Sequence, residues 1–388
     1  TIGRTGGGDD GSTSSLTTPV TSEASSSSLP GETVPSAAPT TAKPRRATTT
    51  TIAPGLGPLP LYFVEVDPRL AGIELSLIGL EQQHVLAELD LARQTLIRRD
   101  FGPFSADSGS IVVGADWVVV TGDMAGTGLV VHDDGSFERV DLGDGWQSFQ
   151  QAGTDRFWRP RDSNGWGPAT LFEQVDLTGR PTGAAIELPA NSWPSESDPA
   201  GGQVVEAAGD LYSVDATSTS HLGSGDLIGI SAVVMVTWDC DERLRCGLFV
   251  TDRQSGDVRR LDVDKLGDEL IERLHNWTGA GGQTISPDGS LCAVMQISDD
   301  EPRLSLIDLT SGAVYELGDG RFLPVVTWSP DDRFIFLLGN VDNELDDGWG
   351  WGWGEGDLFA YDRQIGDVFP VLSEPVEWRA ISIRPGAA

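Results

Sequence analysis

Three tryptophans alternate with glycine near the end of this 388-residue chain, in the segment 340–357 that reads NVDNELDDGWGWGWGEGD. Residues two positions apart lie on one side of an extended stretch, so Trp349, Trp351 and Trp353 can present three indoles together. Such a row suits a sugar ring or an apolar patch of a partner protein. The neighbouring carboxylates can accept hydrogen bonds from hydroxyl or basic groups, and they are Asp346, Asp347, Glu355 and Asp357. The composition favours a loop that folds over its own part of the structure or is mobile because of its glycines. Binding of a ligand or partner by these residues is the alternative hypothesis.

The same segment is rich in acids, which is typical of calcium sites. A loop of the EF-hand type needs glycine at its sixth position and glutamate at its twelfth. Counted from Asp342, those positions hold Asp347 and Trp353. The sequence therefore predicts no metal and no cofactor, with a looser calcium site built from several loops as the alternative.

The three cysteines divide into a pair and a single residue. Cys240 and Cys246 flank DERLR in an expected hairpin, and this spacing favours a disulfide across the loop. A zinc site would require two further ligands, and the nearest histidines, His221 and His275, form no recognisable motif. Cys292 lies in the strand-like run SLCAVM, where we expect a buried free thiol.

No set of residues for catalysis can be named. The chain has four histidines, none beside a nucleophile motif, and it contains no Gly-x-Ser-x-Gly sequence. Pairs of acids catalyse glycoside hydrolysis, but the 59 Asp and Glu residues offer no spacing to test. We expect a non-catalytic protein, with a glycan-acting hydrolase or lyase as the alternative.

These residues belong to a chain built from a repeated unit, seen most clearly in LSLIDLTSGAVYEL at 304–317. Two short alternating strands flank a turn in which an Asp carboxylate can accept backbone N–H groups and a glycine can adopt positive φ. Seven copies occur, at Asp90, Asp133, Asp176, Asp215, Asp252, Asp308 and Asp362. Their spacing of 37 to 56 residues is about the length of a four-stranded propeller blade. The first copy lacks glycine and also fits a helix, so six blades are the alternative to seven.

Two copies have a further turn upstream, SPDG at 286–289 and SPDD at 329–332, between the expected first and second strands. In these residues the chain resembles the propellers of the TolB-like and prolyl-oligopeptidase kind. The other blades match only in strand spacing. A resemblance to WD40 repeats is weaker, because neither the Gly-His nor the Trp-Asp pair recurs. The resemblance implies an all-β fold, a seven-bladed β-propeller of four-stranded blades.

The final segment RAISIRPG, 379–386, aligns with the first strands of the other blades and is followed by no further strand-like run. We expect it to form the inner strand of blade one, whose other strands come from residues 59–98. Closing the ring in this way removes two exposed sheet edges. The propeller should thus span residues 59–388.

Residues 1–55 are rich in Ser, Thr and Pro and contain almost no large apolar side chains. They cannot bury enough apolar surface to offset the conformational entropy lost on ordering, so we expect a disordered linker. Such linkers hold domains away from cell surfaces, and together with the expected disulfide this indicates an extracytoplasmic protein, secreted or anchored at the surface. An upstream signal peptide, lipid anchor or membrane helix would be consistent with this location.

The formal net charge of −33 belongs to the propeller, because four acidic residues balance four basic ones in the linker. So acidic a surface repels phosphate backbones and anionic lipids, which excludes nucleic acid and membrane headgroups as favoured partners. We expect a monomeric sensor, scaffold or binding module of an anchored envelope protein, with a protein or glycan partner. Its site should lie on the irregular loops between the second and third strands of the blades, at 121–127, 159–168, 239–246, 298–302 and 340–357.

Overall fold

The computed structural model describes residues 61–81, 84–102, 111–121, 127–142, 149–151, 153–161, 171–188, 192–215, 217–240, 246–263, 270–272, 284–297, 302–317, 322–339, 356–373, 376 and 378–384. The chain divides into two units, Thr1–Thr49 and Thr50–Ala388, and the first unit lies outside the described residues. The linker predicted at 1–55 lies outside them too and stays a prediction.

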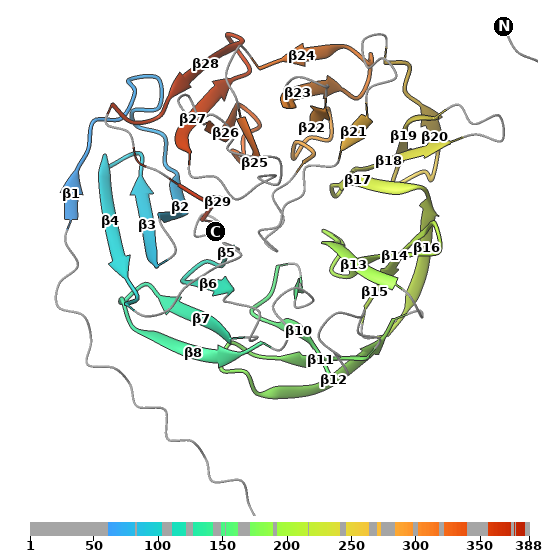
Figure 1. The fold of residues 1–388 in the computed structure, drawn as a ribbon, viewed down its shortest axis with the longest axis horizontal. Helices are drawn as coiled ribbons and strands as arrows, with labels where there is room; N and C mark the ends of the chain where they lie inside the picture. Colours follow the sequence, from blue (N-terminus) through green and yellow to red (C-terminus); the bar gives the residue numbers. More distant parts are fainter. Residues whose placement is uncertain are drawn as a thin grey trace, which may run out of the picture. The chain divides into compact units, whose positions relative to one another are not determined.

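Seven antiparallel sheets follow one another around a ring, so the chain is a seven-bladed β-propeller (Figure 1). From the inner strand outward, blade one contains β29 (Ala380–Ile383), β2 (Ser76–Glu81), β3 (Val85–Asp90), β4 (Thr95–Asp100) and β1 (Leu61–Phe63). Blade two contains β5 (Ile111–Val113), β6 (Trp117–Thr121), β7 (Thr127–His132) and β8 (Phe137–Asp141). Blade three contains β9 (Phe149–Gln150), β10 (Phe157–Pro160), β11 (Leu171–Val175) and β12 (Pro181–Glu187). Blade four contains β13 (Ser192–Ser197), β14 (Gln203–Ala207), β15 (Asp210–Val214) and β16 (Thr219–Ser224).

The remaining three blades have the same order of strands. Blade five contains β17 (Asp226–Ile230), β18 (Val234–Cys240), β19 (Cys246–Asp252) and β20 (Val258–Arg260). Blade six contains β21 (Leu270–Glu272), β22 (Leu291–Ile297), β23 (Pro302–Asp308) and β24 (Val314–Glu316). Blade seven contains β25 (Phe322–Trp328), β26 (Phe334–Gly339), β27 (Asp357–Asp362) and β28 (Asp367–Pro370).

The ring closes as predicted, through the C-terminal strand. β29 pairs with β2, from Ala380 opposite Leu80 to Ile383 opposite Leu77. A backbone contact also joins blade one to blade seven, because the Asp67 N–H donates to the Val371 carbonyl at 3.0 Å in the segment that leaves β28. Blade one is therefore held to blade seven by both ends of the described chain.

The hydrophobic core lies between the blades, because each sheet is apolar on both of its faces. Buried side chains form seven clusters, and each cluster combines residues from two neighbouring blades. Among the described residues, the interface between blades seven and one contains 19 buried hydrophobic residues, against 5 to 10 at the others. The interface that closes the ring is thus the most extensively packed.

All seven predicted turns join the third strand of a blade to the fourth. The segment 85–98, which also fitted a helix, forms β3 and β4, and the Asp90 carboxylate accepts the Arg93 N–H at 2.8 Å. In blade two the structure differs from our expectation, because Asp134 accepts the Ser136 N–H at 2.8 Å in place of Asp133. The Asp133 carboxylate instead forms an ion pair with the Arg384 guanidinium, with Oδ1 and Nη1 2.9 Å apart.

The inner strand of blade six also differs from the sequence pattern. We expected it immediately before the turn at 286–289, whereas β21 lies further upstream and pairs with the end of β22. Among the residues that the structure describes here, the bridge of Ile285 opposite Cys292 continues the pairing next to the turn. The inner position is thus shared by two pieces of chain, which agrees with the long spacing of this repeat.

Candidate functional site

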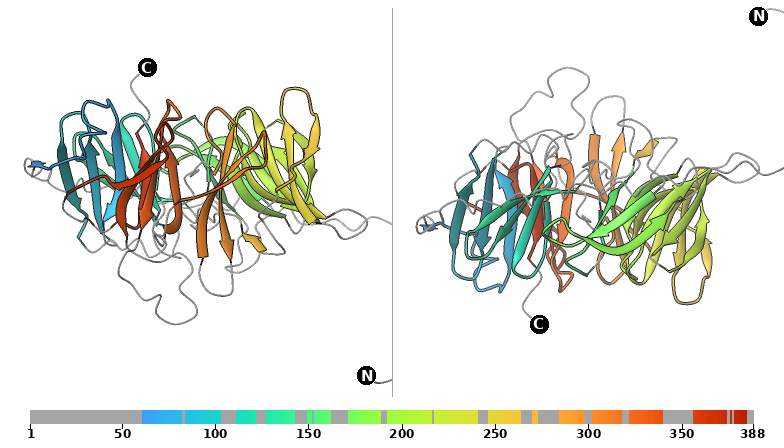
Figure 2. Two further views of the ribbon diagram at one scale, coloured as in Figure 1. Left: turned by 90° about the horizontal axis from the view of Figure 1, so that it is seen from above. Right: turned by 90° about the horizontal axis from the view of Figure 1, so that it is seen from below.

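The strand order gives the ring two distinct sides, which are seen edge-on in Figure 2. Turns between first and second strands, and between third and fourth strands, lie on one side, here called the turn face. Connections between second and third strands lie on the other side, here called the loop face. All five loops expected to carry the site connect a second strand to a third, although most of their residues lie outside the described ranges.

The tryptophan segment, residues 340–355, leaves the ring after Gly339 at the end of β26 and returns at Gly356 before β27. Of the predicted site residues, only Asp357 is described. It is half-buried and lies opposite Gly339 as the first residue of β27. The others lie outside the described residues and stay predictions, and they are Trp349, Trp351, Trp353, Asp346, Asp347 and Glu355.

Both ends of the tryptophan segment are held at one point. The Gly356 N–H donates to the Trp378 carbonyl at 2.9 Å, and the Trp378 N–H donates to the Gly356 carbonyl at 2.8 Å. A Cβ atom on Gly356 would lie only 2.9 Å from the Gly339 carbonyl oxygen. The two glycines therefore allow a close backbone approach that a larger residue would prevent.

Two aromatic rings support this base. The rings of Phe322 and Phe359 meet edge to face, with centroids 5.8 Å apart. A Cβ atom on Gly339 would lie 2.8 Å from the Phe359 ring and 3.1 Å from the Phe322 ring. The point from which the tryptophan segment leaves is therefore packed tightly against the blade.

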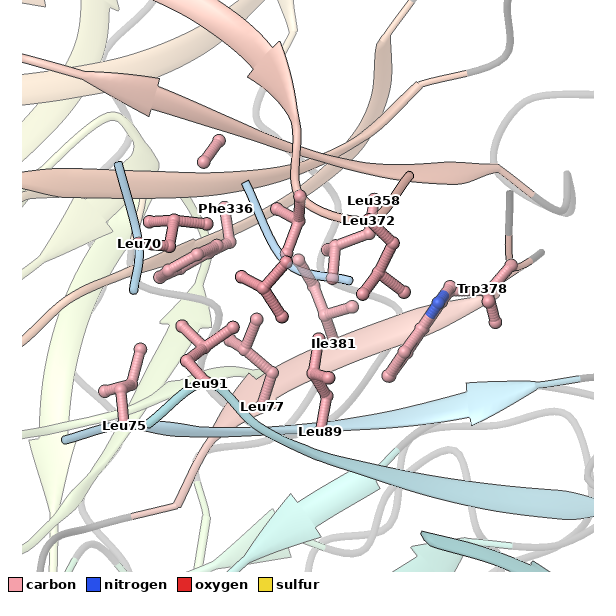
Figure 3. Close-up of a cluster of buried hydrophobic side chains, with 14 of the residues drawn as sticks. Leu70, Leu75, Leu77, Leu89, Leu91, Phe336, Leu358, Leu372, Trp378 and Ile381 are labelled. Carbon is pink, nitrogen blue, oxygen red and sulfur yellow. The ribbon is translucent and has the colours of Figure 1, made fainter. Parts of the chain in front are cut away.

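Trp378 is the residue of this base that sequence reasoning missed. Its side chain is fully buried and packs among Leu358, Leu372 and Ile381 at the closing interface (Figure 3). A Cβ atom on Gly79 would lie 1.5 Å from the indole, so the indole rests on the bare backbone of β2. The sequence offered one signal for this contact, the isolated glycine inside the apolar run SLIGLE. Such a glycine often marks a place where another group approaches the strand backbone closely.

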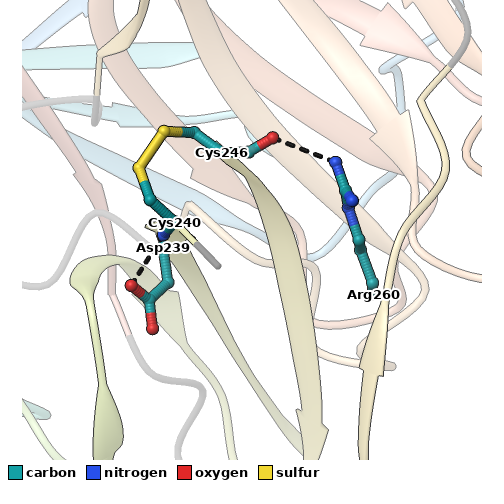
Figure 4. The surroundings of a disulfide bond; sticks show 4 residues. All are labelled: Asp239, Cys240, Cys246 and Arg260. Carbon is teal, nitrogen blue, oxygen red and sulfur yellow. Dashed lines mark hydrogen bonds between the residues drawn. A yellow bond between two sulfur atoms is a disulfide. The ribbon is translucent and has the colours of Figure 1, made fainter. Parts of the chain in front are cut away.

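The predicted disulfide is present at the loop face of blade five (Figure 4). Cys240 ends β18 and lies directly opposite Cys246, which begins β19. Arg260 of β20 donates to the Cys246 carbonyl at 3.1 Å. Cys292 is a buried free thiol, as expected, and burial raises its pKa.

Carboxylates of the turn face accept hydrogen bonds from backbone N–H groups. The Thr217 hydroxyl, together with the Thr217 N–H, lowers the pKa of Asp215 to about 2. Burial has the opposite effect on Asp332 and raises its pKa. The Asp332 carboxylate is nevertheless engaged, because it accepts the Asp288 N–H at 3.1 Å.

The described residues contain no group of three or more His, Cys, Asp or Glu residues placed to hold a metal ion. Within the same ranges, no helix is long and apolar enough to cross a membrane.

No protein-family model matches this sequence, and a search of curated proteins finds no match. Solved propellers are similar in structure. TolB from Acinetobacter baumannii has a TM-score of 0.42 and 17% identity, over 81% of this chain and 84% of that one. AztD from Citrobacter koseri has a TM-score of 0.42 and 11% identity, over 81% and 98%. A puromycin-hydrolyzing peptidase from Mycobacterium tuberculosis has a TM-score of 0.50 and 12% identity, over 81% of this chain and 53% of the peptidase. At these identities the likeness concerns the fold, which is the propeller that the SPDG turns indicated.

Proposed function

We propose that the ring is a non-catalytic binding module whose principal contact is the tryptophan segment of the loop face. The proposal rests on the contacts at the base of this segment. Gly339, Gly356 and Trp378 bring both ends of the segment to one point on a tightly packed blade. Loops presented by a rigid scaffold are common positions for binding residues.

The composition of the segment indicates what it binds. Three indoles spaced two residues apart suit the apolar face of a sugar ring or an apolar patch of a protein. Acids on both sides of them accept hydrogen bonds from sugar hydroxyls or from basic side chains. The ligand is therefore a glycan or a protein segment, and the ring serves as the sensor or scaffold part of a larger envelope protein.

The proposed location is outside the cytoplasm. Disulfides persist in oxidising compartments, and the Cys240–Cys246 bond is exposed at the loop face. The Ser-, Thr- and Pro-rich residues 1–55 would act as a spacer between the ring and an upstream anchor.

The test replaces Trp349, Trp351 and Trp353 together with alanine. Binding is measured on a glycan array and against a panel of purified envelope proteins, beside the thermal unfolding of each variant. Binding should be lost while the melting temperature stays nearly constant. The control is Tyr315→Ala, which removes a 47% exposed aromatic residue from the outer strand β24.

Two results would contradict the proposal. Unchanged binding would show that the tryptophans are not the contact. A large fall in melting temperature would show that the indoles pack against the blade. Release of reducing sugar during the same incubations would instead support the glycan-acting enzyme.

A further inference from the structure

β1 is the outermost strand of blade one and lies at the rim of the ring (Figure 1). It exposes three consecutive apolar side chains. Leu61 is 52% exposed, Tyr62 45% and Phe63 84%. β1 is also an additional strand, because within the described ranges the other six sheets contain four strands each and this one contains five. It pairs with β4 on one side, and among the described residues no strand pairs with its other side.

The register shows which backbone groups face the open edge. The Val64 N–H donates to the Gln94 carbonyl at 3.0 Å, which continues the pairing of β1 with β4. Hydrogen-bonded and non-hydrogen-bonded pairs alternate along an antiparallel ladder, so Tyr62 belongs to the same class as Val64. Leu61 and Phe63 therefore direct their N–H and C=O groups away from β4, towards the open edge.

The three residues of β1 include no charge, proline or bulge, which are among the features that prevent edge pairing. Its sequence is LYF, whereas the outermost strands of the other blades contain charges, proline or mainly polar residues. These strands read FERVD in β8, PTGAAIE in β12, TSHLGS in β16, VRR in β20, VYE in β24 and DVFP in β28. β1 alone combines an open backbone edge with an unbroken apolar surface among the described outer strands.

One contact holds β1 in this position without occupying its edge. The Arg98 guanidinium lies over the Tyr62 ring, 5.5 Å from its centroid, and Arg98 is itself paired with Glu81. Tyr62 is thus fixed against blade one, while the outward N–H and C=O groups of Leu61 and Phe63 stay available for hydrogen bonds.

We propose that β1 is a docking edge that accepts an extended segment of a partner protein, which adds to blade one as a further strand. In this mode the main chain supplies hydrogen bonds and alternate side chains supply specificity. Charge selects the kind of segment. The chain has a formal net charge of −33, so a second copy is repelled and a segment with alternating apolar and basic residues is attracted. This site is independent of the tryptophan segment, because it uses the outer strand of blade one.

The test uses the full chain and two labelled synthetic peptides, one alternating lysine with valine and one alternating glutamate with valine. Fluorescence anisotropy measures the dissociation constant of each. The lysine peptide should bind, more weakly as salt rises, and the glutamate peptide should not. Binding should slow hydrogen exchange at the amides of Leu61 and Phe63, while the Tyr62 amide changes little because it already faces β4.

Two variants at one position distinguish the contribution of the backbone N–H to peptide binding from that of the side chain. Phe63→Ala removes the ring, whereas Phe63→Pro also removes the outward N–H and leaves the bonds to β4 in place. We expect Phe63→Pro to bind the lysine peptide about tenfold more weakly than Phe63→Ala does. Similar melting temperatures of the two variants would confirm that β1 is still paired with β4. If Phe63→Pro melts lower, the proposal is judged on the unaltered chain, by whether the lysine peptide slows hydrogen exchange at the Leu61 and Phe63 amides.

Three results would overturn the proposal. The first is failure of the lysine peptide to bind. The second is equal binding by the two peptides or by the two variants. The third is a concentration-dependent dimer in sedimentation that Phe63→Pro dissociates, because the occupant of the edge would then be a second copy of the chain.

Discussion

Arg253, in a turn of blade five, donates a hydrogen bond to the Asp198 carboxylate of blade four at 2.7 Å. Asp198 is 1% exposed and also accepts the Ser213 hydroxyl at 2.7 Å and the Ala200 N–H at 2.8 Å. The same guanidinium donates to the Ser231 carbonyl at 2.7 Å. One buried carboxylate therefore connects two blades at the turn face.

We expect Asp198→Ala to lower the free energy of unfolding by about 3–5 kcal/mol, because it leaves a partly buried guanidinium without its counter-charge. Urea unfolding followed by tryptophan fluorescence measures this change. Arg93→Gln is the control, since Arg93 is 82% exposed in its pair with Asp90 and should change stability by less than about 1 kcal/mol. Equal effects of the two substitutions would show that the contact between the blades adds no stability.

Gly79→Ala should destabilise the ring by about 3 kcal/mol or more, because the new methyl group would overlap the Trp378 indole. A double-mutant cycle identifies the cause. Trp378→Leu should be destabilising alone. The double variant should lose less free energy of unfolding than the sum of the losses in the two single variants. Strict additivity would mean that the cost of Gly79→Ala arises elsewhere.

Removing the disulfide should weaken the ring without altering its fold. β18 and β19 remain joined by six further residue pairs, so Cys240→Ser with Cys246→Ser should cost about 2 kcal/mol by the loop-entropy argument. A thiol reagent provides a second measurement on the unaltered protein. No thiol should react in the native state, and Cys292 alone should react after unfolding without reductant. Three reactive thiols in that unfolded sample would contradict the disulfide.

The stability of the turn in blade four should decrease at low pH. The pKa of Asp215 is lowered from 3.8 to about 2, so its ionised form is favoured in the folded state. The resulting stabilisation is present above about pH 4 and is lost as the pH falls towards 2. Thr217→Val removes the hydroxyl donor and should raise the pKa of Asp215 towards 3.8, which a carboxyl carbon NMR titration measures. An unchanged pKa would show that the hydroxyl is not responsible.

Local features were predictable from the sequence. In the turn at Asp308, the carboxylate accepts the N–H groups of Thr310 and Ser311, and Gly312 has a φ of 75°. These partners are within four residues of each other, so residue type and order are sufficient to indicate the turn. The disulfide was visible for the same reason, since Cys240 and Cys246 flank a single hairpin. Even the closing strand could be placed, because RAISIRPG repeats the pattern of the other inner strands.

Only the tertiary structure determined the contacts that join distant segments. The base of the tryptophan segment depends on Gly356 meeting Trp378, and the indole in turn needs Gly79, which lies on a different blade. Arg253 reaches Asp198 across 55 positions, and β1 meets β4 although no repeat contains a fifth strand. The physical reason is that these contacts follow from the angle and spacing of neighbouring blades. That geometry results from packing all seven sheets into one closed ring, which no local pattern in the sequence records.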